Sequence, residues 1–161
     1  MTPRRLDLIG TLARVGLAAV FLISGYLKAS DLDQTYVAVN AYQVLPKPAV
    51  EAVAVVLPWF ELALGLLVLL GVGTRIVAVI SALLLLTFMA GVTQAWVRGL
   101  SIDCGCFGGG GDVATEKTSY GLELLRDTGF MILAVWLIVR PRTLMSLDEF
   151  LARNGDGTGP S

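Results

Sequence analysis

Long apolar runs alternate with short polar segments along this chain. Four of the runs come close to the length of about 20 residues that a helix needs to cross the hydrocarbon core of a bilayer. They cover residues 6–28, 49–70, 76–97 and 120–139. The pattern predicts an all-α polytopic membrane protein, a bundle of four transmembrane helices.

The polar segments divide the chain further. Apolar residues recur at helical spacing within 31–47, which predicts a short helix on the membrane surface. Pro58 lies inside the second run and predicts a kink there, because proline removes a backbone donor. Residues 98–118 are expected to form a loop between the third and fourth runs. The four runs and their connections make up a four-span membrane domain, residues 1–144. Residues 145–161 are expected to form a short interfacial helix and a disordered tail.

Composition strengthens the membrane interpretation. Of the 161 residues, 55% are hydrophobic and only 16% are charged, and mean hydropathy is +0.75. A protein core alone does not bury such an apolar excess in a chain of this length, so the expected surroundings are a lipid bilayer. The net charge of -1 gives no basic footprint for nucleic acid. With no histidine in the chain, acid–base chemistry and haem ligation by that residue are excluded.

Basic residues next to the runs predict the orientation. Cytoplasmic loops carry an excess of Lys and Arg, and disulfides persist outside the cytoplasm. Both termini are therefore expected in the cytoplasm, with loop 98–118 on the extracytoplasmic side of the cell membrane. The larger basic set is Arg4, Arg5, Arg75, Arg140, Arg142 and Arg153, against Lys28, Lys47, Arg98 and Lys117 on the other side.

Both cysteines of the chain lie in that loop, as Cys104 and Cys106. A ring closed across one residue is strained away from relaxed disulfide geometry, so it should accept electrons readily and exchange. Gly105 lowers the steric cost of the closure. The alternative is a structural clip, although so short a loop removes little entropy from the unfolded chain. Zinc favours about four ligands from Cys, His or carboxylate, so a metal site is only a minor alternative: Asp103 and Asp112 would complete a poor, oxygen-rich one, or two chains would share one.

Two charges fall within the first two apolar runs. Arg14 and Glu61 are expected at similar depths from the same face, because each lies about eight to ten residues from the cytoplasmic end of its helix. An unpaired charge at that depth is costly, so the prediction is an ion pair inside the bundle. The pair either fixes helix register only or takes part in proton handling or ligand binding.

A second polar group lies nearer the loop. Glu123 and Arg126 are expected to pair at i,i+3 spacing, and Asp127 to find a partner in Lys28 or Arg98. Lys28, Arg98 and Glu123 alternatively extend to water from the interface. Arg98 and Lys117 flank the loop and are the candidates for stabilising a thiolate there.

Residues 102–108, Ile-Asp-Cys-Gly-Cys-Phe-Gly, resemble the signature loop of the methylamine utilisation protein MauE family, within the wider MauE/DoxX group of redox-associated membrane proteins. The resemblance extends over most of the chain. In the fourth run, Arg126-Asp127 stands where the family often has Arg-Asn. The other segments that carry the resemblance are 24–28, 42–46 and 58–65.

This resemblance implies a four-helix membrane protein that works with a thioredoxin-like extracytoplasmic partner in forming or maintaining disulfides of exported proteins. Cys104 and Cys106 are the expected catalytic residues. Gly105, Phe107, Arg98 and Lys28 are expected to support the loop.

The leading hypothesis is thiol–disulfide exchange through a mixed disulfide with the partner. The sequence itself defines no cofactor, and a membrane quinone near the outer half of the bundle is the candidate electron acceptor. One rival hypothesis is a non-enzymatic membrane anchor or assembly factor for a redox partner, with the cysteines as a clip. Another is a small-ligand carrier that uses Arg14 and Glu61.

Overall fold

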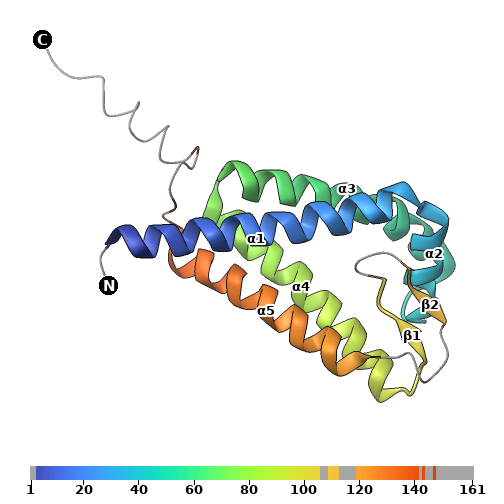
Figure 1. The fold of residues 1–161 in the computed structure, drawn as a ribbon. Coiled ribbons are helices and arrows are strands. Elements are labelled where there is room, and N and C mark those ends of the chain that lie inside the picture. Colours follow the sequence, from blue (N-terminus) through green and yellow to red (C-terminus); the bar gives the residue numbers. More distant parts are fainter. Residues whose placement is uncertain (1–2, 106–108, 113–118, 142, 144–146, 148–161) are drawn as a thin grey trace, which may run out of the picture.

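The computed structural model describes residues 3–105, 109–112, 119–141, 143 and 147. Within them the chain is almost entirely helical, with one small hairpin beside the helices (Figure 1). The tail and interfacial helix expected at 145–161 lie outside the described residues, apart from Leu147. The elements are α1 (Pro3–Ser30), α2 (Leu32–Ala41), α3 (Lys47–Leu70), α4 (Thr74–Val97), β1 (Ile102–Asp103), β2 (Gly111–Asp112) and α5 (Tyr120–Val139).

Helices cover each of the four predicted apolar runs. Among the described residues, α3, α4 and the Arg5–Ser30 part of α1 are long and apolar enough to cross a membrane. Helix α5 has 20 residues, but it carries Glu123, Arg126 and Asp127 in its first turns and is not one of these three. Many large apolar side chains of the bundle are exposed, as expected of a surface that meets lipid rather than water.

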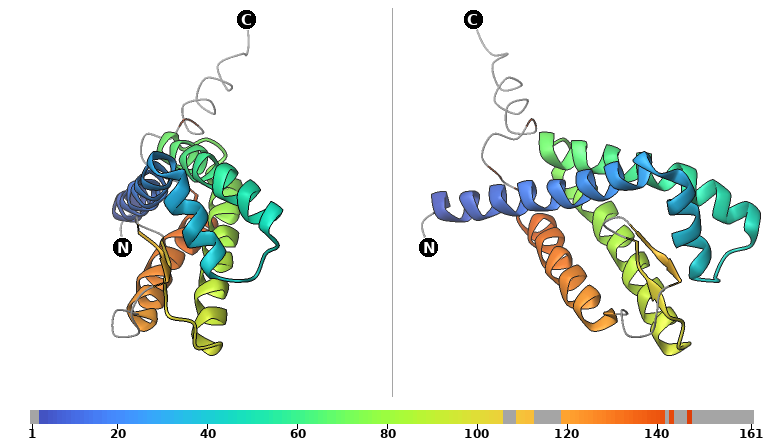
Figure 2. Two further views of the ribbon diagram at one scale, coloured as in Figure 1. Left: turned by 90° about the vertical axis from the view of Figure 1, so that its right-hand side faces the viewer. Right: turned by 45° about the vertical axis from the view of Figure 1, so that its right-hand side comes forward.

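The long helices are arranged as two antiparallel pairs. Helix α1 lies beside α3 and α4 lies beside α5 (Figures 1 and 2). Helix α3 ends at Gly71, whose φ of 69° is the left-handed conformation that glycine adopts at low cost. A common core joins the four long helices: Ala13, Leu17, Ala18, Phe21, Leu64, Val68, Val77, Ala78, Ala82, Leu85, Ala134 and Leu137.

The other end of the bundle is wider. From the turn after Leu70, α3 and α4 diverge, and α2 and the hairpin lie at the open end of the wedge (Figures 1 and 2). The start of α1 and the end of α5 lie at the opposite end of the molecule (Figure 1). A second core forms beneath the hairpin, from Ala41, Val92, Ala95, Ile102, Cys104 and Tyr120.

Candidate functional site

A small antiparallel strand pair anchors the start of the segment that carries the cysteines. Strands β1 and β2 pair antiparallel, with Ile102 opposite Asp112 and Asp103 opposite Gly111. Cys104 follows β1 directly, while Cys106 and Phe107 lie outside the described residues. Ile102 is 1% exposed and belongs to the second core, so the first cysteine is held against the helices rather than on a free loop.

Two tyrosines fix the backbone of this segment. The hydroxyl of Tyr120, the first residue of α5, accepts from the Ile102 amide (3.1 Å) and donates to the Leu100 carbonyl. The hydroxyl of Tyr42, at the end of α2, donates to the Cys104 carbonyl (3.1 Å). The position of the cysteine backbone is therefore set by two separate helices.

Gly105 lies where a side chain does not fit. Its φ is +66°, and a Cβ there would come within 2.9 Å of the Cβ of Ala38 on α2. Beside it, Gln34 Nε2 donates to the Gly110 carbonyl (2.7 Å). The loop-support role expected of Gly105 thus has a steric basis, because α2 packs directly on the cysteine segment.

The sulfur of Cys104 lies beside a guanidinium. Arg126 Nη2 is 3.6 Å from Cys104 Sγ, and the Cys104 residue is 9% exposed. The sequence had suggested Arg98 and Lys117 for this role. Arg98 donates instead to the Gln43 carbonyl (3.3 Å), and Lys117 lies outside the described residues. Arg126 reaches the sulfur because the Tyr120 hydroxyl ties the start of α5 to the cysteine segment.

Two carboxylates complete the surroundings of the sulfur. One oxygen each of Asp103 and Glu123 and the Cys104 sulfur all lie within 4.8 Å of one another. Asp103 Oδ1 also accepts from the Gly105 amide (3.2 Å). A carboxylate beside a thiol is suited to accepting its proton, whereas zinc favours a set richer in Cys and His.

A second polar cluster lies deeper, between α1 and α3. Lys28 Nζ is 3.0 Å from both carboxylate oxygens of Glu61, and it donates to Ser24 as well. Ser24 donates in turn to Glu61. Lys28 is only 8% exposed and Glu61 is fully buried, so Lys28 is turned inward and does not extend to water as the interfacial alternative supposed. The ammonium also lies 5.5 Å above the centre of the Phe88 ring, a cation–π arrangement.

The predicted ion pair between Arg14 and Glu61 is wrong. Gly25 packs against the backbone of Pro58 and Leu62, which sets the antiparallel register of α1 and α3. Arg14 precedes Gly25 by about three turns, roughly 16 Å along α1. The prediction had aligned the start of α1 with the end of α3, whereas α1 projects beyond that end (Figure 1). Arg14 instead donates to Thr143 Oγ1 (3.0 Å), after the end of α5.

Asp127 also has a different partner from the one expected. Its Oδ1 accepts from Nε and Nη2 of Arg126 (3.3 Å each), the residue beside it on the same helix, rather than from Lys28 or Arg98. Arg126 forms its ion pair with Asp127, while Glu123, the partner expected from the i,i+3 spacing, lies close enough to interact electrostatically with the guanidinium. Asp127 Oδ2 is buried with no hydrogen-bond partner among the described residues.

The two polar clusters meet at a small void. Ser24, Glu61 and Asp127 all line it, together with Phe21, Phe88 and other apolar side chains. A series of polar groups therefore leads inward from the sulfur, through Arg126 and Asp127, to the void that Glu61 also lines. Sequence reasoning named most of these residues but missed Ser24 as a member. Its position four residues before Lys28, on one helix face, is the signal for it.

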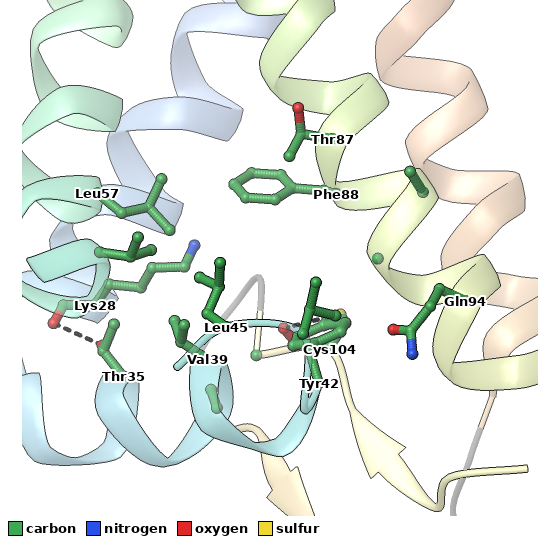
Figure 3. Close-up of a pocket in the computed structure, with 16 residues that line it drawn as sticks. Lys28, Thr35, Val39, Tyr42, Leu45, Leu57, Thr87, Phe88, Gln94 and Cys104 are labelled. Carbon is green, nitrogen blue, oxygen red and sulfur yellow. Dashed lines mark hydrogen bonds between the residues drawn. The ribbon is translucent and has the colours of Figure 1, made fainter. Parts of the chain in front are cut away.

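A cavity of about 460 Å³ lies in the wedge between α3 and α4. Lys28 and Cys104 are both in its wall, along with Phe88 and Gln94 of α4 (Figure 3). Most of the remaining lining is apolar: Ala38, Val39, Val44, Leu45, Val53, Leu57 and Ala90. The two polar clusters thus border one apolar chamber.

The match to known sequences spans this whole arrangement. The sequence profile of the family described as "Methylamine utilisation protein MauE" matches residues 6–140, from the first turns of α1 to the end of α5. The chain belongs to the MauE family. The family resemblance predicted from the cysteine loop is confirmed.

One curated relative is the "Methylamine utilization protein MauE" of Paracoccus denitrificans, which is 36% identical over 98 residues. That alignment covers 60% of this chain and 53% of the relative, so the chain spans about half the length of the MauE protein it matches. No solved structure matches this member of the MauE family.

Proposed function

We propose that this chain is a membrane redox protein that exchanges disulfides with a thioredoxin-like extracytoplasmic partner during the maturation of exported proteins. The observation that carries the proposal is the contact between Arg126 and the Cys104 sulfur. A guanidinium beside sulfur favours the thiolate, which is both the nucleophile and the leaving group of exchange. A purely structural cysteine has no need of it.

We assign separate roles to the two cysteines, and the burial of Cys104 supports this. A thiolate of the partner attacks Sγ of Cys106, the bond between Cys106 and Cys104 breaks, and Cys104 leaves as a thiolate beside Arg126. A second thiolate of the partner then attacks the mixed disulfide and releases Cys106. The partner loses two electrons and becomes a disulfide, and the cysteine pair gains them as a dithiol.

The orientation in the membrane belongs to the same proposal. Helix α5 is the fourth span, with the charged groups of its first turns turned toward the cysteine segment and the bundle interior. The start of α1 and the end of α5 lie at one end of the molecule and the hairpin at the other, as an even number of spans requires (Figure 1). The excess of basic residues at the first end supports a cytoplasmic location for it.

Trapping tests this function. In Cys104→Ser, the Cys106 thiolate attacks the disulfide of an oxidised partner, and Cys104 is no longer present to resolve the mixed disulfide. In cells quenched with acid and alkylated we therefore expect a reductant-sensitive adduct with a thioredoxin-like extracytoplasmic protein. Cys106→Ser should trap far less, and the double variant none. If neither single variant yields an adduct in cells that contain such partners, exchange is overturned.

The rival function is a membrane anchor or assembly factor with the cysteines as a clip. Its supporting observation is that Tyr42 and Tyr120 hold the segment rigidly. The carrier alternative loses its site, because Arg14 and Glu61 do not meet. An anchor predicts that the double cysteine variant still assembles with its partner and supports oxidation of exported proteins at the normal rate.

A further inference from the structure

The wedge cavity combines apolar walls with polar groups at a few points. Its volume of about 460 Å³ falls within the range of small-molecule sites, about 300–1,000 Å³. Lys28 contributes a buried ammonium and Cys104 a sulfur, with Phe88 above them in the view of Figure 3. A ligand here would lie between both polar clusters of the protein.

Gln94 points to a ligand with hydrogen-bonding oxygens. Both Nε2 and Oε1 of its amide are buried, and neither has a hydrogen-bond partner among the described residues. Gln94 nevertheless lines the cavity. A buried amide left unpaired costs free energy, and a turn of the Gln94 side chain toward the cavity would let an acceptor oxygen there pair with Nε2.

Exposed apolar side chains form the edge of the cavity. Val44 and Leu45, in the connection from α2 to α3, line the cavity and are 60% and 42% exposed. Ala90 of α4 lines it too and is exposed. An entrance edged by apolar side chains admits a lipid-soluble molecule more readily than a charged metabolite.

We propose that this cavity binds a membrane quinone, with a carbonyl oxygen on Gln94 and the ring close to Cys104. The inference rests on the proposed function, for which it supplies the electron acceptor. The dithiol of Cys104 and Cys106 loses two electrons and two protons as its S–S bond forms. The quinone gains both and becomes a quinol, so two S–H bonds are replaced by two O–H bonds.

Photolabelling of the full-length protein tests the site. The probe is an azido derivative of decylubiquinone, with unlabelled decylubiquinone as competitor and peptide mapping as the readout. We expect labelled peptides from α2 and the facing parts of α3 and α4. Ala90→Trp, which fills the edge of the cavity, should abolish the labelling. Leu86→Trp, one turn away on α4, exposed and outside the lining, is the matched control and should label normally.

Gln94→Leu tests whether the cavity recognises a carbonyl oxygen of the quinone or is simply filled by any apolar molecule. Loss of one hydrogen bond should weaken competition by decylubiquinone about three- to tenfold. Thermal stability should not fall, because the amide has no hydrogen-bond partner among the described residues to lose. If decylbenzene, which lacks the carbonyl oxygens, competes as well as decylubiquinone, the cavity holds an acyl chain and the inference is overturned.

Electron transfer is measured separately. Pre-reduced protein mixed with decylubiquinone should form one quinol per chain, and Ala90→Trp should suppress this while still giving the trapped adduct in the Cys104→Ser background. Trapping without quinone binding would overturn this inference alone. Quinone binding without any trapped adduct would overturn disulfide exchange and leave the site standing.

Discussion

Arg126 Nη2 lies 3.6 Å from the sulfur of Cys104, while Nε of the same guanidinium pairs with Asp127 Oδ1 at 3.3 Å. The guanidinium thus joins the cysteine segment to a buried carboxylate that faces the interior of the bundle. A change in charge on the sulfur alters the electrostatic environment of Asp127 through the Arg126 side chain alone. Three parts of the protein, the hairpin, α5 and the central void, are coupled at this residue.

Removing the guanidinium should slow the chemistry of the thiol. We expect alkylation of reduced Cys104 in Arg126→Met, in a Cys106→Ser background, to be several-fold slower at neutral pH and to need a higher pH, because less thiolate is present. Arg126→Lys keeps the positive charge and should recover much of the rate. Equal rates in all three proteins would show that Arg126 has no influence on the sulfur.

Breaking the buried pair should destabilise the bundle strongly. Glu61→Gln leaves the Lys28 ammonium buried without a counter-charge, and loss of one partner of such a pair costs about 3–5 kcal/mol. Thermal unfolding in detergent, read by circular dichroism, measures the change. The double variant Lys28→Met/Glu61→Leu should lose much less than the sum of the single variants. Unchanged redox turnover in Glu61→Gln would limit the pair to a structural role.

Adding one methyl group at Gly25 should push α1 away from α3 and destabilise the bundle. In Gly25→Ala the new Cβ would come within 2.9 Å of the Pro58 carbonyl oxygen and the Leu62 amide nitrogen. Backbone atoms cannot move aside cheaply, so we expect a loss of about 1–3 kcal/mol in thermal unfolding. Gly121→Ala, at a glycine of α5 with nothing within 4 Å of the added Cβ, is the control and should be neutral. A neutral Gly25→Ala would contradict the close helix contact.

The Tyr120 hydroxyl should control access to Cys104. Tyr120→Phe removes the acceptor of the Ile102 amide and the donor to the Leu100 carbonyl, and leaving buried backbone groups unpaired costs about 1–3 kcal/mol. Hydrogen exchange across 100–104 should become faster, and so should alkylation of Cys104. Tyr26→Phe, at an exposed position on α1, should change neither rate.

Labelling of intact cells tests the proposed orientation. The chain has only two cysteines, so after reduction a membrane-impermeant maleimide should label the wild-type protein at the loop and nowhere else. Val72→Cys, in the turn between α3 and α4 of a cysteine-free background, should be labelled only after the cells are permeabilised. The reverse pattern would place the cysteine loop in the cytoplasm and contradict extracytoplasmic exchange.

Much of the fold follows from the sequence, because runs of apolar residues fix where helices form even when they do not fix how helices meet. The start of α5 at Tyr120 and its end at Val139 agree with the predicted run. The Arg14–Glu61 error has a different origin. Helix register depends on the close approach at Gly25, which the hydrophobic pattern does not encode, and this contact sets Lys28 opposite Glu61.

Around the cysteines, too, the sequence predicts the local feature but not the tertiary contact. The Cys-Gly-Cys spacing alone indicated a reactive site. Nearness in sequence favours Arg98 and Lys117 as the residues beside the sulfur, whereas Arg126 comes from the next helix. Its place depends on the tertiary contact of the Tyr120 hydroxyl with the cysteine segment, which has no local sequence signal.

The reduction potential of the Cys104–Cys106 pair tests the central claim most directly. Full-length protein is equilibrated with glutathione buffers of known ratio, alkylated, and scored for the disulfide by mass spectrometry. An exchanging pair should have a potential between about −270 and −120 mV, the range of thiol–disulfide exchange proteins. A value below about −300 mV, typical of structural disulfides, would make the pair a clip and contradict the account.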